Sequence, residues 1–62
     1  MDYRELIRKK RIEKGLSQYK LAALIGITQP FMNEIESGRK NPSVDVLMKI
    51  CKELDIIMFS ES

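Results

Sequence analysis

The chain has 62 residues, which suits one small domain, and a domain of this size buries only about 60% of its unfolded surface, so pairing with a second copy is one usual source of stability. With one cysteine and no histidine, we expect no intrachain disulfide and no zinc or other metal site, which fits a reducing cytoplasm. The net charge is +2, but the charges are unevenly distributed along the chain. Residues 1–40 carry nine Lys/Arg and five acidic residues, and residues 41–62 carry two Lys/Arg and four acidic residues. This distribution favours a protein that turns one basic face to a polyanion.

Residues 2–14 are predicted to form the first helix. Asp2 and Glu5 lie in its first turn and basic residues gather towards its end, which complements the helix dipole. The apolar stripe expected to face the core consists of Tyr3, Leu6 and Ile7, with Ile12 off the stripe. The segment is charged throughout, unlike a signal peptide, and the longest apolar run, residues 21–27, is too short for a membrane span.

Two short helices separated by a tight turn are predicted over residues 18–25 and 29–37. Each follows a hydroxyl residue that can cap its first turn and precedes a glycine that can take positive φ; these residues are Ser17, Gly26, Thr28 and Gly38. Pro30 lies in a first turn, where its missing N–H costs nothing. The apolar side of the earlier helix is expected to comprise Leu21, Ala22, Leu24 and Ile25.

The helix over residues 29–37 has two different faces. Its inward face by periodicity carries Thr28, Met32, Ile35 and Glu36. Its outward face carries Pro30, Asn33, Glu34 and Ser37, with Gln29 on the flank. A thin apolar stripe opposite a small, amide-rich face is typical of a helix-turn-helix whose second helix enters the major groove of DNA.

The segment from residue 15 to 43 resembles the signature region of the lambda repressor/Cro-like family of helix-turn-helix domains. The matching elements are Gly15-Leu16-Ser17-Gln18, Leu21-Ala22, Gly26, Thr28-Gln29, Met32, Ile35-Glu36, Gly38 and Pro42-Ser43. The resemblance covers roughly residues 5–54. It implies one all-α domain over residues 1–62, a compact bundle of four or five helices that binds double-stranded DNA as a transcriptional regulator, most simply a repressor acting as a homodimer.

The resemblance also implies roles for individual residues. Those expected at base edges are Thr28, Gln29, Pro30, Asn33 and Glu34. Gln29 and Asn33 carry amides that could pair with adenine N6 and N7, whereas Glu34 would repel phosphates unless it accepts from a cytosine N4. Those expected at phosphates are Ser17, Gln18, Ser37, Arg39, Lys40 and Asn41.

Two further side chains of this region have a structural interpretation. By resemblance, Arg11 pairs with Glu36 and ties the first helix to the reading helix, because an unpaired inward carboxylate would be costly. Phe31 fits two roles equally well, packing on a thymine methyl or packing against the preceding helix.

The last helix is predicted to begin after Pro42, with Ser43 as its cap. Its core stripe would comprise Val44, Leu47, Met48, Ile50, Cys51 and Leu54, with Cys51 a small buried hydrophobe. Residues 55–62 hold four consecutive apolar residues and would form a short fifth helix or an extended strand. The expected two-fold interface consists of Val46, on the side away from the stripe, and Ile56, Ile57, Met58 and Phe59.

One rival function class stays open. The same helices could serve as a protein-interaction module, such as an antitoxin or the accessory subunit of a larger complex, that grips a partner through the apolar tail. An enzyme is not expected, because the lone cysteine and the acids form no arrangement with a base or metal, and no cofactor is implied.

Overall fold

The computed structural model describes residues 2–57, which form four helices and no strand. The helices are α1 (Tyr3–Glu13), α2 (Gln18–Ile25), α3 (Gln29–Ser37) and α4 (Val44–Leu54). The predicted all-α fold with a helix-turn-helix in its second and third helices is confirmed. Most of the predicted fifth helix or strand, including Met58 and Phe59, lies outside the described residues.

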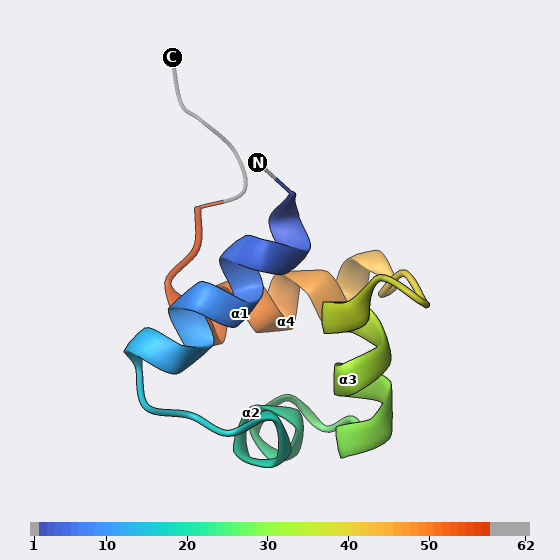
Figure 1. The fold of residues 1–62 in the computed structure, drawn as a ribbon, viewed down its shortest axis with the longest axis horizontal. Coiled ribbons are helices and arrows are strands. Elements are labelled where there is room, and N and C mark those ends of the chain that lie inside the picture. The colour runs from blue at the N-terminus through green and yellow to red at the C-terminus, as the bar shows by residue number, and fades with distance from the viewer. Residues whose placement is uncertain (1, 58–62) are drawn as a thin grey trace.

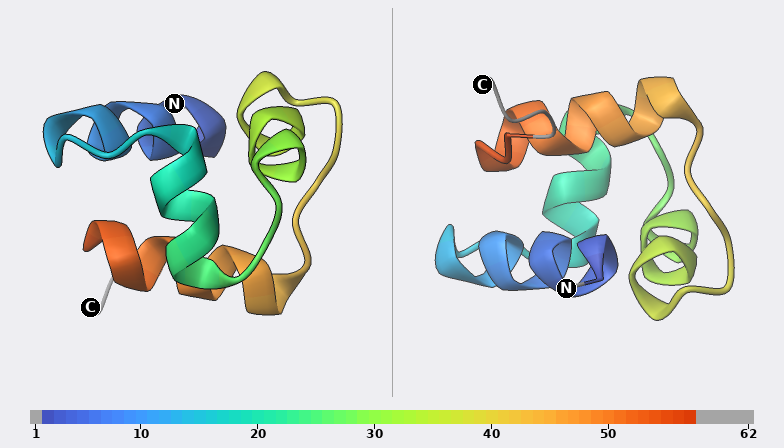
Figure 2. Two further views of the ribbon diagram at one scale, coloured as in Figure 1. Left: turned by 90° about the horizontal axis from the view of Figure 1, so that it is seen from below. Right: turned by 90° about the horizontal axis from the view of Figure 1, so that it is seen from above.

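The four helices enclose one core. In Figure 1, α1 lies in front of α4, α2 crosses below them and α3 stands at one end. The turned views in Figure 2 show α1 and α4 running in roughly the same direction, with α2 spanning the space between them. Both α3 and α4 pack against α1 and against α2. The buried core side chains come from all four helices and are Ile7, Leu21, Ala22, Ile25, Met32, Ile35, Ile50 and Leu54.

The predicted ends of α2 and α3 and the predicted start of α4 are confirmed, whereas α1 is one residue shorter at each end than predicted. Asp2 precedes α1 and accepts from the backbone N–H of Arg4, so the helix begins at Tyr3 rather than at residue 2. Ser43 caps α4 by accepting from the N–H of Val46 at 3.2 Å. In both helices the residue just before the first turn accepts from a backbone N–H two or three residues ahead. This local hydrogen bond specifies where the helix begins.

The predicted apolar face of α2 is wrong at one residue. Leu21, Ala22 and Ile25 are buried, but Leu24 is 48% exposed. Leu24 lies beside the outer edge of α4, where it lines a shallow hollow with Lys49 and other residues of α4. Because α2 packs through the Leu21–Ile25 side, Leu24 on its flank extends past the partner helix towards solvent.

The predicted core stripe of α4 is confirmed at Leu47, Ile50, Cys51 and Leu54 but is wrong at Val44 and Met48. Val44 is 71% and Met48 is 54% exposed, whereas Val46, expected on the outer side, is half-buried and packs against the core. At ~100° per residue, Val46 lies only about 40° from the buried Ile50, and Met48 lies about 120° from the buried Leu54. Contact with α1 and α2 therefore selects the Ile50–Leu54 side of a helix that carries apolar residues on several sides.

The chain turns sharply after α4. Asp55 takes a left-handed conformation with φ of 57°, and the N–H of Ile56 donates to the Cys51 carbonyl at 2.8 Å. This turn returns Ile56 to the core, where it packs half-buried, while Ile57 is 85% exposed. Cys51 is buried as predicted, and burial raises the pKa of its thiol.

No helix within residues 2–57 combines the length and the apolar character needed to cross a membrane.

Candidate nucleic-acid interface

The turn between α2 and α3 is built from short-range interactions. Gly26 takes φ of 82°, and its N–H and that of Ile27 both donate to the Ala22 carbonyl, at 2.9 and 3.0 Å. Thr28 Oγ1 then accepts from the N–H of Phe31 at 3.2 Å, which starts α3. These contacts confirm the predicted caps and fix the direction in which α3 follows α2.

The inward side of α3 carries an ion pair to α1. Arg11 Nε donates to Glu36 Oε2 at 2.7 Å and Arg11 Nη2 donates to Glu36 Oε1 at 3.1 Å. Arg11 Nη1 also donates to the Leu16 carbonyl at 2.7 Å. The side chains are only 11% and 3% exposed, so a bidentate, charge-assisted pair lies under the helix-turn-helix. The structure thus brings together the two residues that the resemblance pairs.

A chain of amides leads from this pair to the surface. Gln18 Nε2 donates to Glu36 Oε1 at 3.1 Å. Gln18 Oε1 accepts from Gln29 Nε2 at 2.9 Å and from Asn33 Nδ2 at 3.3 Å. Because an ionised carboxylate only accepts hydrogen bonds, Glu36 turns the nitrogen of Gln18 inward and its oxygen outward. That oxygen in turn orients the nitrogens of Gln29 and Asn33 towards it.

Sequence reasoning missed this network. It identified each amide as a separate candidate, and it assigned Gln18 to a phosphate. A usable signal was present, since Gln29 and Asn33 are four residues apart and share one side of a helix, and Gln18 follows the cap of the helix packed beside it. The pairing of the three amides depends on the packing of α2 against α3, which sequence spacing does not give.

The outward side of α3 borders a shallow hollow. Its lining consists of Gln29, Pro30, Asn33, Glu34 and Arg39, which includes four of the five predicted base-edge residues. The fifth, Thr28, is exposed at the start of the helix. Glu34 Oε1 lies 3.6 Å from Lys40 Nζ, which offsets part of the negative charge that made Glu34 a poor neighbour for DNA. Phe31 packs half-buried against the core, in agreement with the second of its two predicted roles.

The loop after α3 is held from two sides. The N–H groups of Arg39 and Lys40 donate to the Glu34 carbonyl at 2.9 and 3.2 Å. From α1, Arg4 Nη1 donates to the Gly38 carbonyl and the Tyr3 hydroxyl donates to Asn41 Oδ1, each at 3.4 Å. Sequence reasoning did not anticipate this contact between the start of α1 and the loop.

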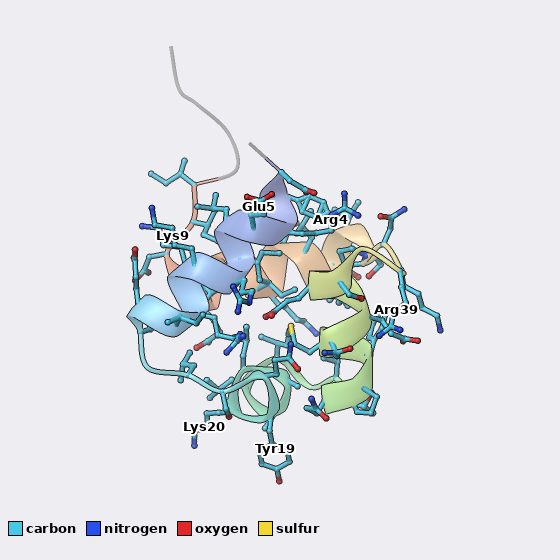
Figure 3. The ribbon with its side chains drawn as sticks, viewed as in Figure 1. Arg4, Glu5, Lys9, Tyr19, Lys20 and Arg39 are labelled. Carbon is cyan, nitrogen blue, oxygen red and sulfur yellow. The ribbon has the colours of Figure 1, made fainter. Side chains whose placement is uncertain are left out.

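The predicted phosphate residues lie at two places. Ser17 is exposed at the start of α2, where its Oγ accepts from the N–H of Lys20 at 2.9 Å. Those of the loop, Arg39, Lys40 and Asn41, are exposed and follow Ser37 at the end of α3. Figure 3 shows Lys20 and Tyr19 pointing outward from the first turn of α2, two positions that sequence reasoning left unassigned.

The described residues offer no metal centre, since residues 2–57 hold no group of three or more acidic, cysteine or histidine side chains placed around a common point.

Comparison with known proteins identifies the class. The helix-turn-helix family matches residues 7–56, which is most of the chain. The chain therefore belongs to the helix-turn-helix family of DNA-binding transcriptional regulators, and the resemblance to its lambda repressor/Cro-like group is confirmed. No solved structure matches the chain.

Individual relatives come from bacteria, archaea and a phage. The chain is 35% identical over 60 residues to an uncharacterised HTH-type transcriptional regulator of Sinorhizobium fredii, covering 90% of this chain and 78% of that one. It is 39% identical over 51 residues to another of Methanothermobacter thermautotrophicus, covering 82% and 74%. It is 40% identical over 45 residues to the ImmF control region 10 kDa protein of Bacillus phage phi105, covering 73% of this chain and half of the phage protein.

Proposed function

We propose that the protein is a transcriptional repressor that binds a two-fold DNA operator as a homodimer, with α3 in the major groove. One observation supports the proposal: the amide network anchored on Glu36 engages Gln29 through its Nε2, and its Oε1 makes no hydrogen bond within residues 2–57, on a helix whose apolar side is buried in the core. A reading surface is thus oriented before DNA arrives. The protein would act in the cytoplasm, without a cofactor and without a catalytic step.

Gln29 is the proposed reader of an adenine. One hydrogen of its Nε2 is used by Gln18, which leaves the second hydrogen and Oε1 for a base. This donor and acceptor match adenine N7 and N6 in the bidentate geometry that glutamine favours. Pro30, exposed next to Gln29, offers an apolar surface to a thymine methyl.

Phosphate contacts would fix the protein on the duplex at two places, the start of α2 and the loop after α3. Ser17 and Gln18 lie at the start of α2, where free N–H groups and the helix dipole favour an anion. Lys40 and Asn41 lie exposed in the loop beyond α3. These contacts would supply affinity that does not depend on sequence and that weakens with added salt.

A dimer would double the length of the site, because one short helix covers only a few base pairs and paired helices read half-sites ~34 Å apart. The apolar surface best suited to it is a hollow of about 270 Å³ between α1, α4 and the residues after α4, lined by Tyr3, Leu6, Ile7, Leu47, Cys51, Ile56 and Ile57. The burial of Val46 within the monomer moves the proposed interface away from that residue and towards Ile57, which Met58 and Phe59 follow in the sequence.

Selection of bound sequences from a random duplex pool tests the function. We expect an enriched site with two-fold symmetry and half-sites about 10 base pairs apart. Sedimentation of the full chain at micromolar concentration, with and without that duplex, tests the dimer. A pool without enrichment would contradict sequence-specific binding, and a monomer that binds one half-site tightly would contradict the dimer alone.

A protein-interaction module, such as an antitoxin or accessory subunit, is the second candidate. It is favoured by the exposure of Val44 and Met48, which are 71% and 54% exposed on the outer side of α4. Salt separates the two functions, because binding to DNA releases counterions and weakens steeply with salt, whereas an apolar protein interface responds little.

A further inference from the structure

Arg39 lies against α3 instead of extending freely from its loop. Its Nη2 donates to Asn33 Oδ1 at 3.0 Å and its Nε donates to Ser37 Oγ at 3.2 Å. Figure 3 shows the Arg39 side chain beside α3, on the side of the helix that faces away from α1 and α2. Both acceptors lie on one side of α3, one turn apart, so two hydrogen bonds orient the guanidinium before any ligand binds.

The neighbouring cation is held differently. Lys40 is also exposed, and its Nζ makes one long contact of 3.6 Å with Glu34 Oε1. A flexible, point-like ammonium of this kind suits a phosphate, which needs charge more than orientation. The loop therefore presents two cations of different character, one oriented on the reading face and one loosely held.

The hydrogen bonds of Arg39 leave one edge of its guanidinium free. The group has five N–H donors, and the parallel pair on Nε and Nη2 is used by Ser37 and Asn33. The second parallel pair, on Nη1 and Nη2, remains for a ligand. Its spacing matches O6 and N7 of guanine, the commonest arginine contact in the major groove. Arg39 also lines the hollow beside Gln29 and Pro30, which leaves it open to a base edge.

Asn33 has the opposite condition, because both ends of its amide are occupied. Its Nδ2 donates to Gln18 Oε1 at 3.3 Å and its Oδ1 accepts from Arg39. A bidentate contact with adenine would have to share both ends of the amide with these partners, whereas Gln29 shares only its Nε2 within residues 2–57. Asn33 therefore fits a role in placing Arg39 better than the direct base contact expected from the sequence.

We propose that Arg39 reads a guanine through Nη1 and Nη2, with Asn33 and Ser37 as positioning residues. The inference deepens the proposed function and rests on it. The midpoint between Asn33 and Ser37 lies six residues beyond Gln29, or ~9 Å along the axis at ~1.5 Å per residue. With base pairs ~3.4 Å apart, a helix lying along the groove places the guanine about two to three base pairs from the base that Gln29 reads.

The test compares Arg39→Ala with Lys40→Ala in the full chain, on the duplex selected from the random pool and on its single-base variants. Arg39→Ala is expected to lower the preference for guanine at one position by roughly tenfold and to leave the other positions unchanged. Lys40→Ala is the matched control, expected to weaken binding to all the duplexes alike and to lower the salt slope by about one. Replacing that guanine by 7-deazaguanine, which lacks the N7 acceptor, should weaken binding of the unchanged protein but not of Arg39→Ala.

Asn33→Ala tests the positioning role, because it should reduce the preference at the same guanine while Arg39 is still present. A selected site with no guanine at this spacing would overturn the inference while leaving the proposed function intact. An Arg39→Ala protein that loses affinity for every duplex equally would show a phosphate contact instead. A pool without any enriched sequence would overturn the proposed function, and this inference with it.

Discussion

The outer surface of α2 and α3 differs in chemistry from the outer surface of α4. Around α2 and α3, polar side chains bond to one another in a chain from Glu36 through Gln18 to Gln29 and Asn33. Along α4, the outer side carries exposed apolar residues, with Val44 and Met48 both more than half exposed. The surface of α2 and α3 offers oriented hydrogen-bonding groups, whereas the outer side of α4 offers apolar contact that has no preferred direction.

This difference in chemistry suits the two surfaces to different kinds of partner. Hydrogen bonds require defined angles, so a surface of oriented amides can distinguish the donor and acceptor patterns of base pairs. Apolar contact depends on area rather than angle, so the outer side of α4 and the hollow beside Ile57 suit burial against another surface. Substitutions in the two regions should therefore have different consequences, the largest for stability and the smaller ones for binding and for stability in acid.

Breaking the ion pair under α3 should have the largest effect. Arg11→Met leaves the carboxylate of Glu36, 3% exposed, without its charged partner, and should lower the free energy of unfolding by about 3 kcal/mol or more. Urea unfolding measures this. A double-mutant cycle with Glu36→Gln should give a coupling well above the ~0.5 kcal/mol of a surface pair. The exposed pair Lys10–Glu13, with Nζ and Oε1 3.7 Å apart, is the control, and additive effects at Arg11 and Glu36 would contradict the prediction.

The orientation of α4 can be tested with two truncations on the same helix. Ile50→Ala removes a side chain with no exposure and should lower the free energy of unfolding by about 2–5 kcal/mol. Met48→Ala, two residues away and 54% exposed, should change it by less than about 0.5 kcal/mol. Thermal unfolding compares the two, and similar losses would mean that the buried side of α4 is wrongly assigned.

The oriented amides should affect binding rather than folding. Gln29→Ala should weaken binding to the preferred site by about 1–3 kcal/mol and relax the preference at one base pair. Gln18→Ala, which removes the acceptor that orients Gln29, should relax the same base pair with less loss of affinity. Fluorescence anisotropy on the single-base duplexes measures both. An equal loss on every sequence would identify Gln29 as a phosphate contact.

The smallest effect concerns acid stability at the end of α4. A hydrogen bond from Lys14 Nζ to Asp55 Oδ2 at 2.6 Å lowers the pKa of Asp55 below its usual 3.8. Its stabilising contribution is therefore present above pH ~4 and is lost as the pH falls through the lowered pKa. Asp55→Asn removes the charge while tolerating the left-handed backbone. Urea midpoints from pH 7 to pH 2.5 should show the two proteins converging at low pH; a constant difference would contradict this origin.

Much of the helix-turn-helix could be predicted because its signals act over a few residues. Ser17 and Thr28 cap helices through N–H groups three residues ahead, and Gly26 ends α2 through its own φ. Such contacts do not depend on the rest of the fold. The resemblance then supplied the pairing of Arg11 with Glu36, which lie 25 residues apart and which no local rule connects.

The sequence by itself therefore determined where the four helices lie along the chain, the ends of α2 and α3, and the helix-turn-helix that they form. Only the tertiary structure decided that Val46, and not Val44 or Met48, packs on the core, because apolar residues occur around α4 and contact with α1 and α2 selects among them. It also decided the direction of the amides. Gln18 takes its orientation from Glu36, 18 residues away. Because a carboxylate only accepts hydrogen bonds, Gln18 must direct its Nε2, and not its Oε1, towards Glu36.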